Sequence, residues 1–152
     1  NKHIFQNKKA LILGAGGVVP SLIVSLKDLG MKDIFVTNRT ESKLNKLMEI
    51  YDNIKKLEWG QLEEFDYIIN ATSVGLNEND NLHLDLTKIG NNKFFYDIIY
   101  NPPLTNFLKN AKKNGHNIQN GKMMFIYQAQ KAFELWHGFL PEVNQEVISF
   151  IK

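Results

Sequence analysis

The fold is decided by the stretch Ala10-Leu11-Ile12-Leu13-Gly14-Ala15-Gly16-Gly17-Val18-Val19. Its first four residues form an apolar run typical of a buried strand, and glycines follow at once. From Val19 to Leu29 apolar residues recur at three- and four-residue steps, as on the buried face of a helix. Pro20 suits an early helical position, and Gly30 provides a stop. A strand, a tight turn and a helix in this order predict the opening of a βαβ unit.

The rest of the chain repeats this alternation of short apolar runs and helical spacings. We expect further strands over 34–36, 54–57, 67–69 and 94–96, the last continuing towards Ile99, and helices after Thr40 and over 104–113, 122–137 and 143–151. Such alternation predicts a parallel sheet covered on both faces. We therefore expect a Rossmann-type, doubly wound α/β fold in three αβα layers, as one domain over residues 1–152.

Composition excludes several classes of protein. The chain has 152 residues, of which 43% are apolar and 22% charged, values typical of a globular domain. Eighteen basic residues against sixteen acidic ones give no reason to expect a nucleic acid or a membrane surface as partner. Apolar runs are too short to span a bilayer and no signal-peptide pattern opens the chain, so we expect a cytoplasmic protein. The absence of cysteine excludes disulfides and thiolate chemistry.

The glycine turn lies where a dinucleotide fold binds pyrophosphate, between a strand and the N-terminus of a helix. The fingerprint G-x-G-x-x-G starts at Gly14 and Gly16, but Val19 occupies its third glycine position. A glycine-rich turn without any ligand is the alternative interpretation. The position of the turn in the pattern favours the binding site.

The end of the second strand distinguishes between the two nicotinamide cofactors. An NAD site places an acidic residue there, whereas this chain has Thr37-Asn38-Arg39-Thr40. Arg39 is the only arginine among the eighteen basic residues, and its planar guanidinium suits a phosphate. Lys43 can add a second positive charge, and Asn38 can bond ribose or adenine. These residues favour NADP(H) over NAD, with a solvated surface arginine as the alternative.

Three later segments carry a resemblance to a known family. They are Asn70-Ala71-Thr72-Ser73-Val74-Gly75, Asp97-Ile98-Ile99-Tyr100-Asn101-Pro102 with Thr105, and Gly121 to Gly138. Together with the glycine turn and Asn38-Arg39-Thr40, they resemble the C-terminal, NADP-binding half of shikimate dehydrogenase. The resemblance implies a reversible hydride transfer between NADPH and 3-dehydroshikimate, which gives shikimate on the way to chorismate and the aromatic amino acids.

The resemblance also implies roles for individual residues. The loop that binds the diphosphate would consist of Gly14, Ala15, Gly16, Gly17 and Val18, and the 2′-phosphate and adenosine would contact Asn38, Arg39, Thr40 and Lys43. Thr72 and Ser73 would lie in the loop that passes below the cofactor. Ile98, Gly121 and Met124 would approach the nicotinamide. Tyr100 and Gln128 would reach the polar groups of the substrate, which a phenol and an amide can pair without adding charge. A core-capping tyrosine and a solvated glutamine are the alternatives.

The chain also departs from the family pattern. Val18, Val19 and Pro20 replace the usual small residues and the Ser or Arg after them, Met123 replaces a common glycine, and Asn106 replaces a proline. The family carries its catalytic Lys–Asp pair in an N-terminal domain, and thirteen residues precede Gly14 here. We therefore expect no catalytic residue in this chain, and binding of NADP(H) without turnover.

The four histidines offer no substitute for the catalytic pair. His83 and His116 are predicted to be exposed turn residues, and His137 a structural helix end. No two histidines have metal-ligand spacing, so we expect no metal site.

Other functions remain open from the sequence. A quinate dehydrogenase domain and a stand-alone NADPH sensor are the nearest alternatives, while glutamyl-tRNA reductase and methylene-tetrahydrofolate dehydrogenase share the turn but not the later segments. The apolar start of the helix at 123–127 needs a partner on every side. We expect this start and the apolar side of helix 143–151 to pack near the family's N-terminal domain, and the chain on its own to self-associate or bind a hydrophobic dye.

Overall fold

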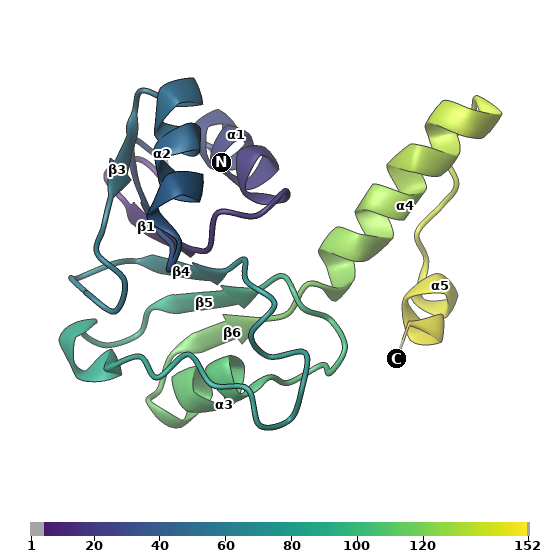
Figure 1. Cartoon of the computed structure of the whole chain (residues 1–152). Coiled ribbons are helices and arrows are strands. Elements are labelled where there is room, and N and C mark those ends of the chain that lie inside the picture. The colour runs from purple at the N-terminus through teal and green to yellow at the C-terminus, as the bar shows by residue number, and fades with distance from the viewer. Residues whose placement is uncertain (1–4, 152) are drawn as a thin grey trace.

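One parallel sheet of six strands organises the computed structural model, which describes residues 5–151 (Figure 1). The strands, in chain order, are β1 (Lys9–Leu13), β2 (Asp33–Thr37), β3 (Ile54–Lys56), β4 (Tyr67–Asn70), β5 (Phe94–Asp97) and β6 (Asn117–Gln119). Their order in the sheet is β3-β2-β1-β4-β5-β6. The order reverses between β1 and β4, so their carboxyl ends mark the switch point where open α/β sheets bind ligands.

Helices cover both faces of this sheet. The helices of the described residues are α1 (Val19–Asp28), α2 (Glu41–Ile50), a short 3₁₀ helix η2 (Leu86–Lys88), α3 (Asn106–Lys113), α4 (Lys122–His137) and α5 (Gln145–Phe150). Helices α1 and α2 lie on one face and α3 on the other (Figure 1). Alternate residues of β1 enter separate cores, since Ile12 packs with α1 and α2 whereas Leu11 packs with α3. The three-layer, doubly wound α/β fold predicted from the sequence is confirmed.

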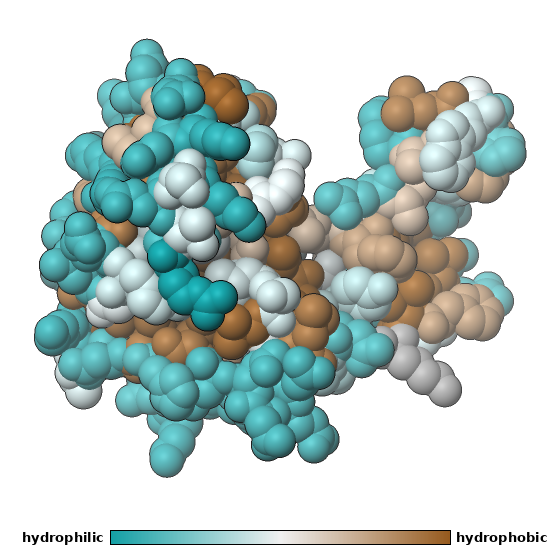
Figure 2. All heavy atoms as spheres, in the orientation of Figure 1, coloured by the Kyte–Doolittle hydropathy of each residue, from teal (hydrophilic) through white to brown (hydrophobic). Residues whose placement is uncertain are grey.

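Helices α4 and α5 differ from the rest. They project from the end of the sheet as a helical pair, which we call the arm (residues 122–151), and we call residues 5–121 the body (Figure 1). Ile126 is the one buried residue of α4, and α5 has none. Figure 2 shows hydrophobic surface gathered on this part of the molecule. Its exposed large apolar side chains are Phe125, Tyr127, Leu135, Trp136, Phe139, Leu140, Val147 and Phe150.

Several elements differ from the sequence-based prediction: η2 was not predicted, and α3 begins at Asn106 rather than at 104. The edge strand β6 was not predicted, because Ile118 is its only apolar residue and lies between Asn117 and Gln119. The last helix is shorter than the predicted 143–151. It begins after Asn144, whose side chain accepts a hydrogen bond from the N–H of Val147 and so caps the helix there.

The prediction for His116 was wrong. The side chain is only 7% exposed and stacks on the ring of Phe95, with the ring centroids 4.9 Å apart. Its Nδ1 accepts a hydrogen bond from the backbone N–H of Lys93 at 3.3 Å. Burial and the positive charge of Lys93 lower the pKa of His116, so the ring favours its neutral form. It is a core residue that joins β6 to β5.

Candidate functional site

The glycine turn follows β1 at the switch point of the sheet. Gly14 has φ +112°, and a side chain there would place its Cβ 2.9 Å from the carbonyl oxygen of Ala71. Its N–H donates to the carbonyl of Thr37 at 2.7 Å, which ties the turn to the end of β2. Glycine is therefore required at this position by both conformation and space.

Gly16 and Gly17 differ from Gly14, because an added Cβ would meet almost nothing. Within residues 5–151, no protein acceptor takes the N–H groups of these two glycines. The turn leads directly into α1, where Val19 is completely buried and Pro20 occupies the first turn as predicted. Unpaired N–H groups at a helix N-terminus are suited to an anion.

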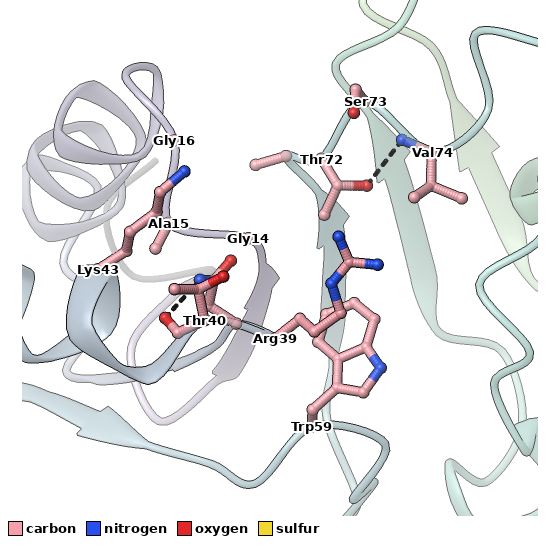
Figure 3. A pocket seen from close by; sticks show the side chains of 12 residues that line it. Gly14, Ala15, Gly16, Arg39, Thr40, Lys43, Trp59, Thr72, Ser73 and Val74 are labelled. Atoms are coloured by element: carbon pink, nitrogen blue, oxygen red, sulfur yellow. Dashed lines mark hydrogen bonds between the residues drawn. The ribbon is translucent and has the colours of Figure 1, made fainter.

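The turn between β2 and α2 carries the cationic groups. Asn38 donates from Nδ2 to the carbonyl of Thr40 at 2.7 Å, which holds the turn in shape. Thr40 precedes α2 as predicted, although its side chain makes no capping hydrogen bond. Arg39 projects from this turn and Lys43 from the first turn of α2, and both are exposed. Figure 3 shows Lys43 extending towards the glycine turn and Arg39 lying beside Trp59.

These segments enclose a hollow of about 390 Å³. Among residues 5–151, Arg39 and Lys43 are the two ionisable residues that line it, and no carboxylate does. The hollow therefore combines positive charge with free backbone donors, the chemistry that a phosphate ester needs. The residues that line it are Gly14, Ala15, Gly16, Asn38, Arg39, Thr40, Lys43, Trp59, Ala71, Thr72, Ser73 and Val74.

A buried amide shapes the loop after β4. Asn70 accepts hydrogen bonds through Oδ1 from the N–H of Thr72 at 3.1 Å and from its hydroxyl at 2.7 Å. Its Nδ2 donates to the carbonyl of Val74 at 3.0 Å and to Asp97 at 3.1 Å. The Thr72 hydroxyl in turn accepts from the N–H of Val74 at 3.1 Å. The loop that carries Ser73 past the hollow is thus held from within the sheet.

Asp97 connects this loop to the loop after β5. Its carboxylate accepts from Asn70, from the N–H of Ile99 at 3.0 Å and from the hydroxyl of Thr105 at 2.6 Å. Burial raises the pKa of Asp97, and the hydrogen bonds from Thr105, Ile99 and Asn70 offset only part of that effect. One buried carboxyl therefore sets the relative positions of both loops.

A second hollow of about 540 Å³ adjoins the first, sharing Ala71, Thr72 and Ser73 with it. The rest of its lining is Leu76, Ile98, Ile99, Tyr100 and Asn101. The ring of Tyr100 stacks on that of Phe125 with centroids 4.6 Å apart, which places the tyrosine at the joint between body and arm. The two hollows form one crevice from Arg39 to Tyr100.

Most of the residues predicted for the cofactor lie in this crevice, although their individual roles stay predictions. Nine line the first hollow and Ile98 lines the second. Gly121 packs on the backbone of Ile98, where an added Cβ would lie 1.9 Å from the carbonyl oxygen. Neither hollow is lined by Gly17, Val18, Gly121, Met124 or Gln128.

Of the predicted substrate contacts, Tyr100 lies in the second hollow and Gln128 is an exposed residue of α4. Sequence reasoning missed Trp59, which lines the first hollow. It follows a three-residue edge strand in a stretch without a recognisable motif, so no sequence signal pointed to it.

His83 and His137 lie outside the crevice. His83 is exposed as predicted, and His137 ends α4 with its ring centroid 4.2 Å from that of Phe133. His3 falls outside the described residues. Among residues 5–151, no group of three His, Asp or Glu side chains could hold a metal ion.

Comparison with known proteins places the chain among dehydrogenases. A family model described as "Shikimate / quinate 5-dehydrogenase" matches residues 1–103. A "Shikimate dehydrogenase (NADP(+))" of Pelagibacter ubique (strain HTCC1062) is 56% identical over 146 residues, which cover 96% of this chain and 55% of the relative. The chain spans about half the length of the curated relatives that it matches.

Solved structures of dehydrogenases and reductases are similar to this chain in fold. Shikimate 5-dehydrogenase from Thermus thermophilus, in complex with NADP(H) and shikimate, superposes with a TM-score of 0.78 at 32% identity, covering 89% of this chain and 51% of that one. The 5-ketofructose reductase of Gluconobacter sp. strain CHM43 superposes with a TM-score of 0.82 at 30% identity, covering 96% of this chain and 56% of that one. No helix within residues 5–151 is both long and apolar enough to cross a bilayer.

Proposed function

Because the chain belongs to the shikimate / quinate 5-dehydrogenase family, we propose that it binds NADP(H) as the cofactor-binding part of an enzyme that reduces 3-dehydroshikimate to shikimate. One observation carries the proposal: the hollow at the switch point combines the glycine turn with two cationic side chains and no carboxylate. The names of the relatives, NADP-dependent shikimate dehydrogenases, support the same cofactor.

The residues of the hollow fit the phosphates of NADP(H). The N–H groups of Gly16 and Gly17 would hold the diphosphate at the start of α1, where the helix dipole favours an anion. The guanidinium of Arg39 and the ammonium of Lys43 would hold the 2′-phosphate. An acidic residue at the end of β2, which an NAD site uses, would repel that phosphate.

The second hollow is where the reacting ring would lie. NADPH supplies the hydride when it is bound; the part of this chain is to bind and orient the dinucleotide and to line the space in front of it. Ile98, with Gly121 packed behind its backbone, would bound that space, and Tyr100 would offer its hydroxyl to the substrate. Tyr100 is the one ionisable residue that lines the second hollow. Reduction of a ketone also needs a positioned proton donor. We assign no such donor to this chain, and we therefore propose that the chain alone binds cofactor without turnover.

Two measurements test this proposal. Calorimetric titration should show saturable binding of NADPH and NADP⁺ and much weaker binding of NADH. Mixing the chain with NADPH and 3-dehydroshikimate should leave the absorbance of NADPH constant. Absence of NADPH binding would overturn the cofactor proposal, and turnover by the isolated chain would overturn the claim that a proton donor is missing.

Quinate is the second candidate substrate, because the description of the matching family names it. We expect the residues that distinguish the two ring substrates to lie mostly outside this chain. Kinetic comparison of shikimate and quinate with the whole enzyme decides between them. A sensor function would instead predict a ligand-dependent partner and no activity of the whole protein on either substrate.

We further propose that the isolated chain self-associates through the arm. Eight large apolar side chains of the arm are exposed, among them Leu135 at 78% and Trp136 at 79%. Large exposed apolar patches on soluble proteins mark interaction sites. Light scattering should give a mass that rises with concentration, and replacing both residues by serine should lower that mass. A monomer at every concentration that also ignores a hydrophobic dye would contradict the proposal.

A further inference from the structure

Trp59 has no role in the function proposed above, yet it faces the cofactor hollow. It follows β3 in the loop that leads to Gly60, whose φ is +85°. Its side chain is 39% exposed and lines the first hollow. With Asn38 and Arg39 it also lines a smaller adjoining hollow of about 170 Å³. The indole therefore forms the wall where the two hollows meet, next to Arg39 (Figure 3).

The surroundings of this indole leave part of its surface open to the hollows. Other aromatic side chains of the body pack ring on ring, as Phe35 does with Phe65 and Phe95 with Phe107. Within the described part of the chain, Trp59 takes part in no ring contact, cation–π contact or hydrogen bond. It is also the single aromatic residue that lines the first hollow. A large apolar surface is thus turned towards a polar, cationic crevice.

The position of Arg39 determines what lies against this surface. The 2′-phosphate of NADP(H) is attached to the ribose that carries the adenine, so a phosphate held by Arg39 leaves the base within a few ångströms. Trp59 is the neighbour of Arg39 in both hollows. An adenine ring has two flat π faces that stack well on an aromatic side chain.

We propose that the indole of Trp59 is the stacking surface for the adenine of the cofactor, an inference that rests on the proposed NADP(H)-binding function. Arg39 and Trp59 then divide recognition of the adenosine end between them. The guanidinium reads the 2′-phosphate and distinguishes NADP(H) from NAD(H). The indole binds the base, which both cofactors share, and so adds affinity without selecting between them.

Fluorescence tests the contact without altering Trp59. The chain has two tryptophans, and Trp136 lies on the exposed surface of the arm. In a Trp136→Phe variant all tryptophan emission comes from Trp59. Titration with adenosine 2′,5′-bisphosphate, which lacks nicotinamide, should change this emission saturably, whereas a Trp59→Phe variant should show no change. Binding of the bisphosphate by calorimetry with unchanged Trp59 emission would overturn the proposal.

Affinities of variants separate the two contacts. Trp59→Ala should weaken adenosine 2′,5′-bisphosphate and adenosine 5′-monophosphate by the same factor, about 5- to 150-fold, because both carry the base. Arg39→Ala should weaken only the bisphosphate, Trp59→Phe should retain most of the affinity, and Trp136→Ala should change neither ligand. Circular dichroism checks that each variant is folded.

The outcomes distinguish this proposal from the one on which it rests. If the unaltered chain binds neither nucleotide, the proposed cofactor function fails. If the chain binds both but folded Trp59→Ala binds them equally well, cofactor binding stands and the role of Trp59 is refuted. If Trp59→Ala weakens only the bisphosphate, the indole acts by holding Arg39 and the adenine contact is refuted.

Discussion

The body and the arm bury their apolar residues to very different extents. In the body, each face of the sheet has its own core. In the core on the α3 side, Phe65, Ile68 and Phe95 are completely buried. In the arm, Ile126 alone is buried and side chains as large as Trp136 lie in water. The body therefore contains the interactions that stabilise its fold, whereas most large apolar side chains of the arm are left uncovered by residues 5–151.

The cofactor crevice belongs to the well-packed region, and its far end meets the arm. Asn70 and Asp97 hold the crevice loops from inside the body. At the joint, Tyr100 stacks on Phe125 of α4. We infer that binding of the phosphates and adenosine of the cofactor depends on the body, while the geometry around the nicotinamide and the substrate also depends on what covers the arm.

Phe95→Ala should have the largest effect. Removing a fully buried phenylalanine loses its contacts with Phe107 and His116 and leaves a cavity, which costs about 3–5 kcal/mol of unfolding free energy. Leu135→Ala in the arm is the matched control and should change that free energy by less than about 0.5 kcal/mol. Urea unfolding measures both, and similar losses at the two positions would refute the contrast between the regions.

Arg39→Ala should weaken NADPH binding by about 10- to 150-fold, because a charged hydrogen-bonding contact to the 2′-phosphate is lost. NADH, which lacks this phosphate, should bind almost as before. Lys113→Ala, on the α3 side of the sheet, serves as a control for net charge and should change neither affinity. Calorimetry with both cofactors checks the result, and equal losses for NADPH and NADH would show that Arg39 does not read the phosphate.

Asp97→Asn should change how stability depends on pH. Burial raises the pKa of the folded Asp97 carboxyl above its ordinary value of 3.8, so the folded state binds this proton more tightly than the unfolded state. The resulting stabilisation is fully present below 3.8 and is lost as the pH rises through the folded pKa. The variant has no titrating carboxyl at this position. It also loses a carboxylate oxygen as hydrogen-bond acceptor, which should lower the unfolding free energy by about 1–3 kcal/mol.

The test of Asp97 is the difference in unfolding free energy between the unaltered chain and the variant. This difference should fall as the pH rises from 3.8 towards neutrality and then level off. Carboxylates with lowered pKa, such as Asp66, contribute equally to both proteins and cancel. A difference that is constant or rises with pH would contradict the assignment.

Phe150→Ser should have the smallest effect on stability. The side chain is 73% exposed at the end of α5, so its replacement should alter the unfolding free energy by less than about 0.5 kcal/mol. Binding of a hydrophobic dye should nevertheless decrease, because apolar surface is removed from the arm. A large loss of stability would mean that the arm is packed more tightly than the structure indicates.

The periodicity of the sequence was sufficient to predict the first five strands of the body and the α-helices between them. Runs such as Ala10-Leu11-Ile12-Leu13 are buried on both sides of the sheet, and glycines or caps bound the helices that follow them. The turn at Gly14 and the lone Arg39 were predicted to share one site, and the structure brings both to the same hollow.

The misses involve residues whose environment is set by distant parts of the chain. The segment Asn117-Ile118-Gln119 pairs with β5 at the edge of the sheet, where Asn117 and Gln119 stay exposed and the strand has no apolar run. His116 is buried because Phe95, twenty-one positions earlier in the chain, stacks on it. Trp59 reaches the crevice because β3 lies beside β2 in the sheet. Local patterns carry no signal for such contacts.

Amide chemical shifts during a titration with NADPH test the central claim most directly. We expect saturable shifts in the glycine turn at 14–18, in the segment 38–43 and in the loop 71–74, with little change in α5. Absence of shifts, or shifts confined to the arm, would contradict the assignment of the cofactor site to the crevice of the body.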